Sequence, residues 1–502
     1  MRKVSSLQKS LIQDRDCFEP TDIGSRNDGH FSDTIAAVST PVGEGGIGIV
    51  RLSGPRSLKI ADEIFKGGHS KEKPSRFATY TTHYGYILNG NKKIDEVILT
   101  VMRAPKTYTK EDVVEINCHG GVVPLKKVLE LVIKKGARSA QPGEFTKRAF
   151  LNGRIDLVQA EAVADIVRAK TDLSLKVAME QLQGGLSKTV KRIRGQLLDV
   201  LANIEASIDF PEEDVEIPIN PPLLAFARKQ GGNKGELEGL KTELEELLLT
   251  FDRGKMLREG VRLAIIGRPN VGKSSLMNVL LGEERAIVTS AAGTTTDTIE
   301  EAINIEGAQM RIVDTAGITS KANIRKKSER NLIEIEGIRR AEEVLKKSEL
   351  ILLIIDGSQY LQEEDRRLLG EIKKKKAIVL INKIDLPHKV RPDNLKNLFA
   401  GNIVKISAKE KININKVKDA ISSMVWDGKI DFTSEVILTN VRHKESVSAA
   451  LRSLNSVVRN SYSPELVAMD LREACLRLGE ITGETITEEV LDRIFERFCI
   501  GK

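Results

Sequence analysis

A glycine-rich turn between an apolar run and a helix-forming run constrains the fold of this chain more than any other feature. Residues 262–266 read Arg-Leu-Ala-Ile-Ile, residues 267–274 read Gly-Arg-Pro-Asn-Val-Gly-Lys-Ser, and residues 275–281 favour a helix. The turn matches the pattern G-x-x-x-x-G-K-[ST] in the strand-to-helix context that the pattern requires. Glycines let backbone N–H groups surround a phosphate there, and the helix N-terminus favours its negative charge. The sequence therefore predicts a nucleotide-phosphate loop in an α/β domain.

Two further motifs supply groups that could hold magnesium beside this loop. Lys273 is expected to reach the β- and γ-phosphates, and Ser274 to ligate magnesium. Asp314-Thr-Ala-Gly317 follows a strand predicted over residues 309–313, so its carboxylate can face magnesium through water and the Gly317 amide can contact the γ-phosphate. Thr295 can supply a second side-chain oxygen to the metal. Because that ligation would depend on the γ-phosphate, the loop around Thr295 is a candidate switch.

Asn382-Lys-Ile-Asp385, after a strand predicted over residues 377–381, is expected to select the base. An aspartate carboxylate accepts two N–H donors from guanine, whereas adenine would leave it unpaired. Each motif alone could be a polar turn, but four in this order after matching strands predict a GTPase. The residues expected to contact GTP are Asn270, Val271, Gly272, Lys273, Ser274, Ser275, Thr289, Ser290, Ala291, Ala292, Gly293, Thr294, Thr295, Asp314, Thr315, Ala316, Gly317, Asn382, Lys383, Ile384, Asp385, Ser407, Ala408 and Lys409.

The residue that follows Gly317 departs from the usual arrangement for hydrolysis. Small GTPases commonly place a water-positioning glutamine there, but this chain has Ile318. Isoleucine cannot orient water, so hydrolysis must be slow or must use another group. Asn270 and residues 289–295 offer oxygen atoms for a monovalent cation, which would place positive charge where an arginine finger otherwise does.

The order of strand-like and helix-like runs predicts several domains. A chain of 502 residues should divide into about three. Residues 33–149 read as an α+β domain, and residues 150–258 and 429–502 read as helical, with one continuous helix expected over residues 156–183. Residues 259–428 alternate strands and helices, as a mainly parallel α/β sheet does. The simplest architecture is a helical domain that is interrupted by an inserted α/β domain.

Composition limits the partners and the compartment that we expect. A net charge of +7 and a pI near 9.0 are compatible with a polyanion such as RNA, although most of the charge is mixed surface. No apolar stretch approaches the roughly 20 residues of a membrane helix. Four scattered cysteines suggest neither a zinc site nor a disulfide framework, and they fit a reducing cytoplasm. Residues 1–32 lack the features of a targeting signal and are interpreted as a disordered extension.

Five motifs outside the nucleotide site resemble the MnmE (TrmE) family of tRNA-modifying GTPases. They are T-P-x-G-x-G-x-x-x-x-x-R at residues 40–51, Tyr-Thr-Lys-Glu-Asp-Val-Val-Glu at 108–115, His-Gly-Gly at 119–121, Pro-Gly-Glu-Phe-Thr at 142–146 and Phe-Cys-Ile-Gly-Lys at 498–502. The resemblance covers residues 33–502. It implies an N-terminal α+β domain that dimerises and binds a folate one-carbon carrier, a discontinuous all-α helical domain, and an inserted Ras-like P-loop G domain.

The resemblance also implies a folate site. Its positions in this chain are Arg51, Glu115, Arg154 and Lys502, and the ligand would be 5-formyl- or methylene-tetrahydrofolate. Arg154 replaces the lysine expected at its position, which keeps a cation but is not conservative for a bidentate contact. Without the resemblance, these four residues would be interpreted as surface charge.

A potassium site and a catalytic glutamate are implied in the same way. The residues that would surround potassium, the last three chiefly through their backbone, are Asn270, Thr289, Ala291 and Thr294. Glu334, in Glu-Ile-Glu-Gly-Ile at residues 334–338, would position water through a second molecule. Because residues 319–331 are longer and more basic than expected, Glu329 competes for this role. Thr296 replaces an arginine of the family's G-T-T-R-D loop, which could alter the switch.

The implied function is GTP hydrolysis coupled to an aminomethyl-type or 5-carboxymethylaminomethyl modification of the wobble uridine of tRNA. A homodimer would act with the flavin- and NADH-using protein MnmG (GidA) in a heterotetramer, and folate would supply the carbon. The alternative is a ribosome-assembly GTPase, an RNA-binding switch that resembles Era-like proteins through the G domain alone. Such proteins usually carry a separate RNA-binding module, whereas residues 432–502 read as helix without the G-x-x-G loop of a KH module.

Overall fold

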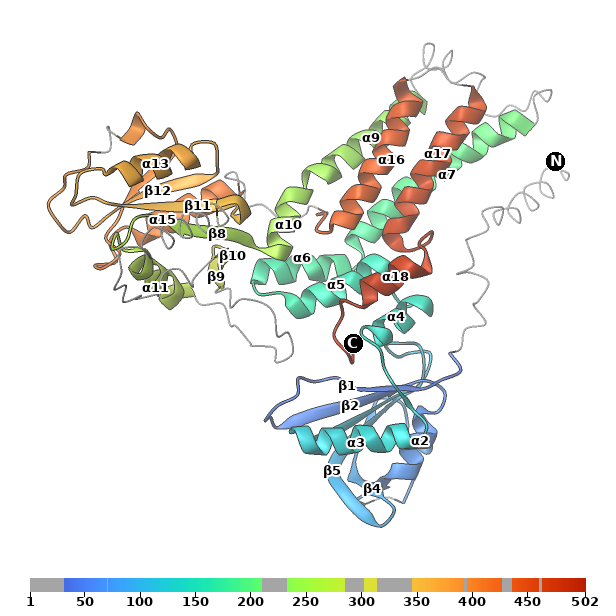
Figure 1. Ribbon diagram of the computed structural model, residues 1–502. Helices are drawn as coiled ribbons and strands as arrows, with labels where there is room; N and C mark the ends of the chain where they lie inside the picture. Colours follow the sequence, from blue (N-terminus) through green and yellow to red (C-terminus); the bar gives the residue numbers. More distant parts are fainter. Residues whose placement is uncertain are drawn as a thin grey trace, which may run out of the picture. The chain divides into compact units, whose positions relative to one another are not determined.

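The structure of the chain is a computed structural model that divides into two compact units (Figure 1). The first unit draws on residues 1–164, 180–245 and 445–502, and the second on residues 165–179 and 246–444. The second unit is therefore inserted between segments of the first. The residues that the structure describes are 31–69, 71–209, 233–284, 302–313, 345–391, 395–426, 436–459 and 463–502.

The first unit contains a seven-stranded sheet in the order β3-β4-β5-β6-β2-β1-β7. Neighbouring strands are antiparallel except for β1 and β7, which are parallel. Buried and exposed residues alternate along much of β5 and β6, as expected for a sheet with one covered face. The strands are β1 (Ile35–Val38), β2 (Ile47–Ser53), β3 (Phe65–Gly67), β4 (Thr81–Asn89), β5 (Lys92–Met102), β6 (Val113–His119) and β7 (Arg138–Ser139).

Two helices supply the cover for this sheet. α2 (Ser57–Ile64) and α3 (Val122–Lys134) place apolar side chains such as Ile60 and Val128 in one core with Leu52 and Ile116 of the strands. Figure 1 shows α3 lying along a face of the sheet. A short 3₁₀ helix, η2 (Pro74–Arg76), precedes β4. The predicted α+β class of this region is confirmed.

Three helices follow the sheet: α4 (Glu144–Leu151), α5 (Leu157–Arg168) and α6 (Asp172–Leu182). The single helix expected over residues 156–183 is therefore wrong. The helix is interrupted before α6 because Thr171 and Ser174 cap the N-terminus of α6 reciprocally. The Thr171 hydroxyl accepts from the Ser174 amide at 3.1 Å, and the Ser174 hydroxyl accepts from the Thr171 amide at 3.2 Å. Such side-chain bonds satisfy N–H groups that an uninterrupted helix would bond internally.

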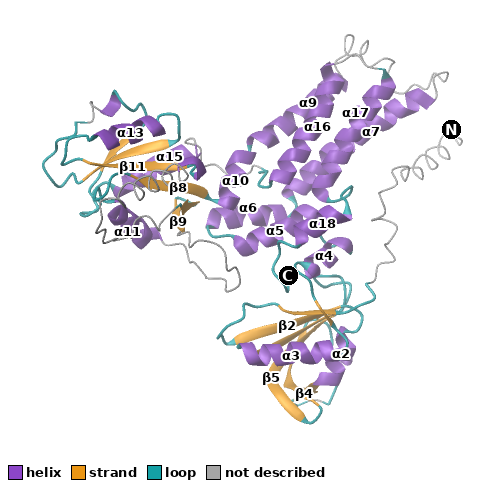
Figure 2. Cartoon of the chain, viewed as in Figure 1, coloured by secondary structure: helices purple, strands orange, loops and turns teal. Residues whose placement is uncertain are grey.

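Long helices from both sides of the insert complete the helical region, which Figure 2 shows in purple. α7 packs along α17, and both contribute buried leucines such as Leu197 and Leu478. None of the helices in the described part of the chain has the length and apolar character needed to cross a membrane. The bounds are α7 (Gly185–Asp209), α9 (Asn233–Leu249), α16 (Val441–Arg459), α17 (Pro464–Thr482) and α18 (Glu488–Phe495).

The second unit is built on a six-stranded sheet in the order β13-β12-β11-β8-β10-β9. Neighbours are parallel except for β9 and β10, so the predicted mainly parallel sheet is confirmed. β11 and β12 are buried along their whole length because helices cover both faces, with α11 and α15 on one and α13 on the other. The elements are β8 (Val261–Ile266), β9 (Ala302–Ile305), β10 (Ala308–Ile312), β11 (Leu350–Asp356), β12 (Ala377–Asn382), β13 (Asn402–Lys405), α10 (Phe251–Glu259), α11 (Lys273–Glu284), α13 (Glu363–Ile372) and α15 (Ile414–Trp426).

Candidate functional site

The described nucleotide motifs gather at one edge of the parallel sheet. Residues 267–272 follow β8, Asn382 ends β12, and Ser407 follows β13. Because these strands are parallel, their carboxyl ends lie at the same edge, where ligands of such sheets bind. The fold therefore brings the predicted phosphate loop and the predicted base motif to one place.

The loop before α11 has a backbone that depends on glycine. Asn270 has a φ of 63° and Gly272 a φ of 106°, in the region that side chains disfavour. A Cβ on Gly272 would lie 2.2 Å from Nδ2 of Asn382. α11 begins directly afterwards at Lys273, so its N-terminal N–H groups are next to the loop. This is the arrangement that binds phosphate at a helix N-terminus.

The side chains of this loop fit a magnesium-bound phosphate. The Lys273 ammonium donates to the carbonyl oxygens of Gly267 and Arg268, both at 2.7 Å. Burial lowers the pKa of Lys273, and a phosphate nearby would favour the charged form again. Ser274 is exposed on the first turn of α11, and its hydroxyl makes no hydrogen bond within the described part of the chain. A free hydroxyl oxygen fits Mg²⁺, which prefers oxygen ligands.

Asn382 joins the phosphate loop to the loop after β13. Its Nδ2 donates to the Val271 carbonyl at 2.7 Å, and its Oδ1 accepts from the Ala408 amide at 2.9 Å. The side chain is only 3% exposed, so both bonds are shielded from water. One amide therefore sets the spacing of two motifs that lie far apart in the sequence.

The Asp385 side chain is held as an ionised carboxylate that can accept hydrogen bonds. Its Oδ1 accepts from the Ser407 hydroxyl at 2.6 Å, and this bond is the main cause that lowers the pKa of Asp385. The carboxylate is therefore ionised at neutral pH. An ionised carboxylate can accept the two N–H donors of guanine that the sequence motif anticipates.

The predicted site omits two groups that support Lys383. Lys383 has a φ of 64°, and its ammonium donates to Oδ2 of Asp356 at 2.6 Å. Asp356 is 2% exposed, and Ser358 donates to its Oδ1 from both amide and hydroxyl, at 3.0 and 2.7 Å. The signal in the sequence was an aspartate at the end of an otherwise apolar strand, in register with Asn382 on β12.

Arg268, within the phosphate loop, is likewise engaged outside the loop. Its Nε donates to both carboxylate oxygens of Asp365 at 2.9 Å. Asp365 is fully buried and also caps α13, because it accepts from the Gln362 amide at 3.1 Å. The phosphate loop is thus tied to α13 as well as to β12.

Several predicted site residues lie outside the described residues. The nucleotide, magnesium and potassium predictions on two segments are therefore carried by the sequence alone. They are Thr289, Ser290, Ala291, Ala292, Gly293, Thr294, Thr295, Asp314, Thr315, Ala316 and Gly317, together with Glu334 and its competitor Glu329.

A second cluster lies in the first unit, where the predicted folate residues are found. Arg51 and Glu115 face each other on β2 and β6, and the Arg51 Nε donates to Glu115 Oε1 at 2.7 Å. The Arg51 Nη1 also donates to the Gly501 carbonyl at 3.4 Å. Ile500 pairs with Pro142, which brings Lys502 to the same region. The structure therefore places Arg51, Glu115 and the Lys502 end of the chain together.

Arg154 reaches this region through Tyr108. Its Nη1 donates to the Tyr108 carbonyl at 3.1 Å, and its guanidinium lies 4.7 Å from the centre of the Tyr108 ring. Tyr108 and Thr146 of α4 share a hydrogen bond of 3.0 Å between their hydroxyls. Cations around one carboxylate fit a ligand that carries both carboxylates and N–H donors, as a folate does.

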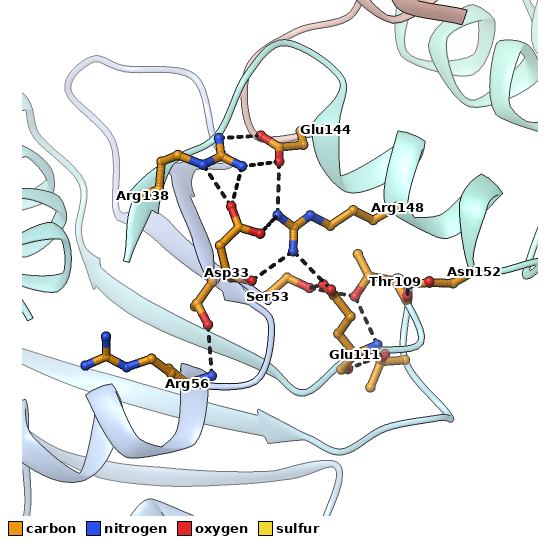
Figure 3. A network of polar contacts seen from close by, with 11 residues as sticks. Asp33, Ser53, Arg56, Thr109, Glu111, Arg138, Glu144, Arg148 and Asn152 are labelled. Carbon is orange, nitrogen blue, oxygen red and sulfur yellow. Dashed lines mark hydrogen bonds and ion pairs between the residues drawn. The ribbon is translucent and has the colours of Figure 1, made fainter. Parts of the chain in front are cut away.

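A buried charge network anchors α4, as Figure 3 shows. Arg148 is 1% exposed and donates to Asp33 at 2.8 Å, and to Glu111 and Glu144 at 3.0 Å each. Arg138 binds Asp33 and Glu144 as well. Burial would raise the pKa of Glu144, but the hydrogen bonds from Arg138, the Gln141 amide and Arg148 hold that pKa below its ordinary value. Sequence patterns did not predict this network, because Asp33 and Glu111 are 115 and 37 residues away from Arg148 in the chain.

Two family models match the chain. The model of the MnmE helical domain matches residues 157–499. The model of the GTP-binding protein TrmE N-terminus matches residues 34–154. Together these matches extend over both described units.

Curated relatives match along nearly the whole chain. The tRNA modification GTPase MnmE of Clostridioides difficile (strain 630) is 45% identical over 476 residues, which cover 94% of this chain and 100% of the relative. The protein of the same name from Alkaliphilus oremlandii (strain OhILAs) is 44% identical over 487 residues, with 94% and 100% covered. Among solved structures, the G domain of the T. maritima FeoB iron transporter is 22% identical, with 33% of this chain and 98% of that chain covered and a TM-score of 0.24.

Proposed function

The chain belongs to the MnmE family of tRNA modification GTPases and is a GTP hydrolase in tRNA modification, and we propose that Asp385 selects guanine in a potassium-activated reaction. The observation that carries the proposal is a set of three hydrogen bonds around the base pocket. Ser407 orients the Asp385 carboxylate, and Asn382 holds the phosphate loop at a fixed distance from it. A pocket preorganised in this way favours guanine over adenine.

Exchange of the base-selecting carboxylate tests this proposal. Asp385→Asn should weaken GTP binding by roughly 100-fold, since an amide cannot accept both guanine donors. The same variant should bind xanthosine triphosphate, whose base offers an acceptor to the new amide. Titration of a fluorescent nucleotide measures both affinities. The control is wild-type protein with xanthosine triphosphate, and unchanged GTP affinity in the variant would contradict the proposed pocket.

The residues of the phosphate loop divide the work of hydrolysis. Lys273 binds the β- and γ-phosphates, while Ser274 and Thr295 hold magnesium. Asn270, with Thr289, Ala291 and Thr294, holds potassium. When bound, both cations supply positive charge where negative charge builds up on the phosphates. Glu334 positions the attacking water through a second water, and Glu329 is the alternative for this role. Ile318 cannot do so, because its side chain has no polar atom.

The second cluster binds a folate one-carbon carrier in this proposal. Arg51, Glu115, Arg154 and Lys502 hold 5-formyl- or methylene-tetrahydrofolate, which supplies the carbon. The support is the docking of the C-terminal residues beside the bonded pair Arg51 and Glu115. The N-terminal domain dimerises, and the homodimer acts in the cytoplasm with MnmG on the wobble uridine of tRNA.

The extent of the family match argues against the ribosome-assembly alternative. That alternative rested on likeness through the G domain alone, whereas the relatives match 94% of the chain. The described residues of the C-terminal segment form the helices α16, α17 and α18. The domain boundaries that we propose are 33–149 for the folate domain, 150–258 and 429–502 for the helical domain, and 259–428 for the G domain.

A further inference from the structure

Two lysine runs meet at the edge of the six-stranded sheet that is opposite to the nucleotide site. Lys346 and Lys347 shortly precede β11, and residues 373–376, all lysines, connect α13 to β12. β11 and β12 are parallel neighbours, with Ile351 in register with Ala377, and the Ile351 amide donates to the Lys376 carbonyl at 3.0 Å. The fold therefore joins two separate runs into one patch of six lysines at the amino ends of β11 and β12, strands that are labelled in Figure 1.

The ammonium groups of this patch are not neutralised within the described part of the chain. All six side chains are exposed, and none forms an ion pair there. Two described carboxylates close to the runs in the sequence pair with arginines instead, Glu349 with Arg262 and Glu371 with Arg367. Lys375 donates to the Leu345 carbonyl, which links the two runs without reducing their charge.

Concentrated like charge is costly for a fold, because the groups repel one another. A polyanion relieves this repulsion and gains free energy when its counterions are released. The patch lies at the amino ends of the strands, whereas the phosphate loop and the guanine pocket follow their carboxyl ends. A polyanion on the patch would therefore leave the nucleotide site open.

We propose that this lysine patch binds the phosphate backbone of tRNA. The inference rests on the role of the chain in tRNA modification, and it adds a contact surface on the G domain. Lysines act as point charges on phosphates, so this surface would supply affinity without reading sequence. RNA is the polyanion that the chain must hold, which makes it the occupant that the charge fits.

A charge-removal variant tests the patch. Lys346, Lys347, Lys373 and Lys374 are replaced by alanine together, and Lys375 is kept because it bonds to Leu345. Fluorescence anisotropy of the full chain with a labelled tRNA transcript gives the Kd at several salt concentrations. We expect affinity to fall by about tenfold or more near 0.1 M salt. The slope of log Kd on log salt should fall by roughly one per lost phosphate contact, while GTP turnover without tRNA is unchanged.

A matched variant separates the patch from net charge. The control replaces four exposed lysines of the first unit by alanine and so removes the same total charge: Lys59, Lys66, Lys127 and Lys134. They should leave tRNA affinity near that of wild type. Equal loss in both variants, or no loss in the patch variant, would overturn the proposal. Failure of the wild-type chain to bind tRNA would instead count against its proposed role. If the patch variant loses binding to anionic-lipid vesicles but keeps its tRNA affinity, the patch binds a membrane and the tRNA proposal is overturned.

Discussion

Asn382 holds the proposed guanine pocket together through both ends of one amide. Its nitrogen and its oxygen each bond to backbone of a different loop, and the side chain is buried. A buried amide that loses a partner is costly, because water cannot replace the lost bond. The space for this amide exists because Gly272 has no side chain.

Gly272→Ala should therefore weaken nucleotide binding. The added Cβ would lie 2.2 Å from the Asn382 nitrogen, at a φ of 106° that alanine disfavours. Strain of this kind costs on the order of 1–3 kcal/mol, which corresponds to a loss of roughly tenfold or more in affinity for GDP. Isothermal titration calorimetry measures it.

Gly282→Ala is the matched control for this substitution. Gly282 lies on α11, and nothing lies within 4 Å of a Cβ added there. The control should bind GDP as wild type does, since alanine is also the better helix former. Wild-type affinity in Gly272→Ala would contradict the close packing that we describe.

At the scale of elements, α4 is the part of the first unit on which the second cluster depends. Phe145 lies beneath the Arg51 guanidinium at 5.7 Å from the ring centre, and Thr146 bonds to Tyr108. The Gly143 amide, just before α4, donates to the Cys499 carbonyl at 3.3 Å. Arg148, on the same helix, carries the network that holds α4 in place (Figure 3).

Arg148→Met should destabilise the first unit strongly. The substitution keeps the length of the side chain but leaves three carboxylates without their buried partner. Breaking such a buried network typically costs about 3–5 kcal/mol. Urea denaturation followed by circular dichroism measures the change. A fall of less than about 1 kcal/mol in the free energy of unfolding would show that the network contributes little to stability.

An exposed arginine of the same unit provides the comparison. Arg192 pairs with Glu243, and its side chain is 50% exposed, so Arg192→Met should cost no more than about 1 kcal/mol.

The effect of Arg148→Met should also depend on pH. The pKa values of Asp33 and Glu144 are lowered in the folded chain, so their contribution is present above the ordinary value of 4.5 for Glu144 and is lost as the pH falls below it. The difference in the free energy of unfolding between Arg148→Met and wild type should therefore become smaller below that pH.

At the scale of the whole molecule, the second cluster combines residues of the N-terminal sheet with residues near Lys502. The hydrogen bond from Arg51 to Gly501 joins residues that are 450 positions apart. Gly501 has a φ of 93°, and a Cβ there would lie 2.3 Å from the Val38 carbonyl, so the tail fits closely against β1. The described residues of the candidate nucleotide site lie in the second unit.

Deletion of Lys502 should separate the two sites. We expect binding of 5-formyltetrahydrofolate to fall by about tenfold, because the Lys502 cation is lost. GTP turnover should stay within about twofold of wild type, since the nucleotide residues lie in the other unit. Equilibrium dialysis and a phosphate-release assay measure the two. An equal fall in folate affinity and in GTP turnover would indicate general damage to the fold. Unchanged folate binding would exclude Lys502 from the folate site.

The arrangement of the described part of the candidate nucleotide site could be anticipated from the sequence, because its residues lie in short contiguous motifs. Residues 267–274 and 382–385 carry their ligand groups on neighbouring positions, and each follows an apolar strand. The roles of Asp356 and Arg148 were not predicted, because Asp356 acts on Lys383 and Arg148 on Glu111, which only the folded chain brings near. The break at Thr171 was missed for a different reason, since the residues on both sides favour helix and only the local bonds between Thr171 and Ser174 interrupt it.

GTP turnover of the full chain in potassium chloride and in sodium chloride, at equal ionic strength, tests the proposed hydrolytic mechanism most directly. Asn270, on the phosphate loop at a φ of 63°, is the described residue of the proposed cation site, and Asn270→Ala serves as the control. We predict turnover at least about tenfold faster in potassium for wild type, because a fixed cation stabilises the charge that develops on the phosphates. The variant should lose this stimulation. Equal wild-type rates in both salts would contradict the potassium-activated mechanism.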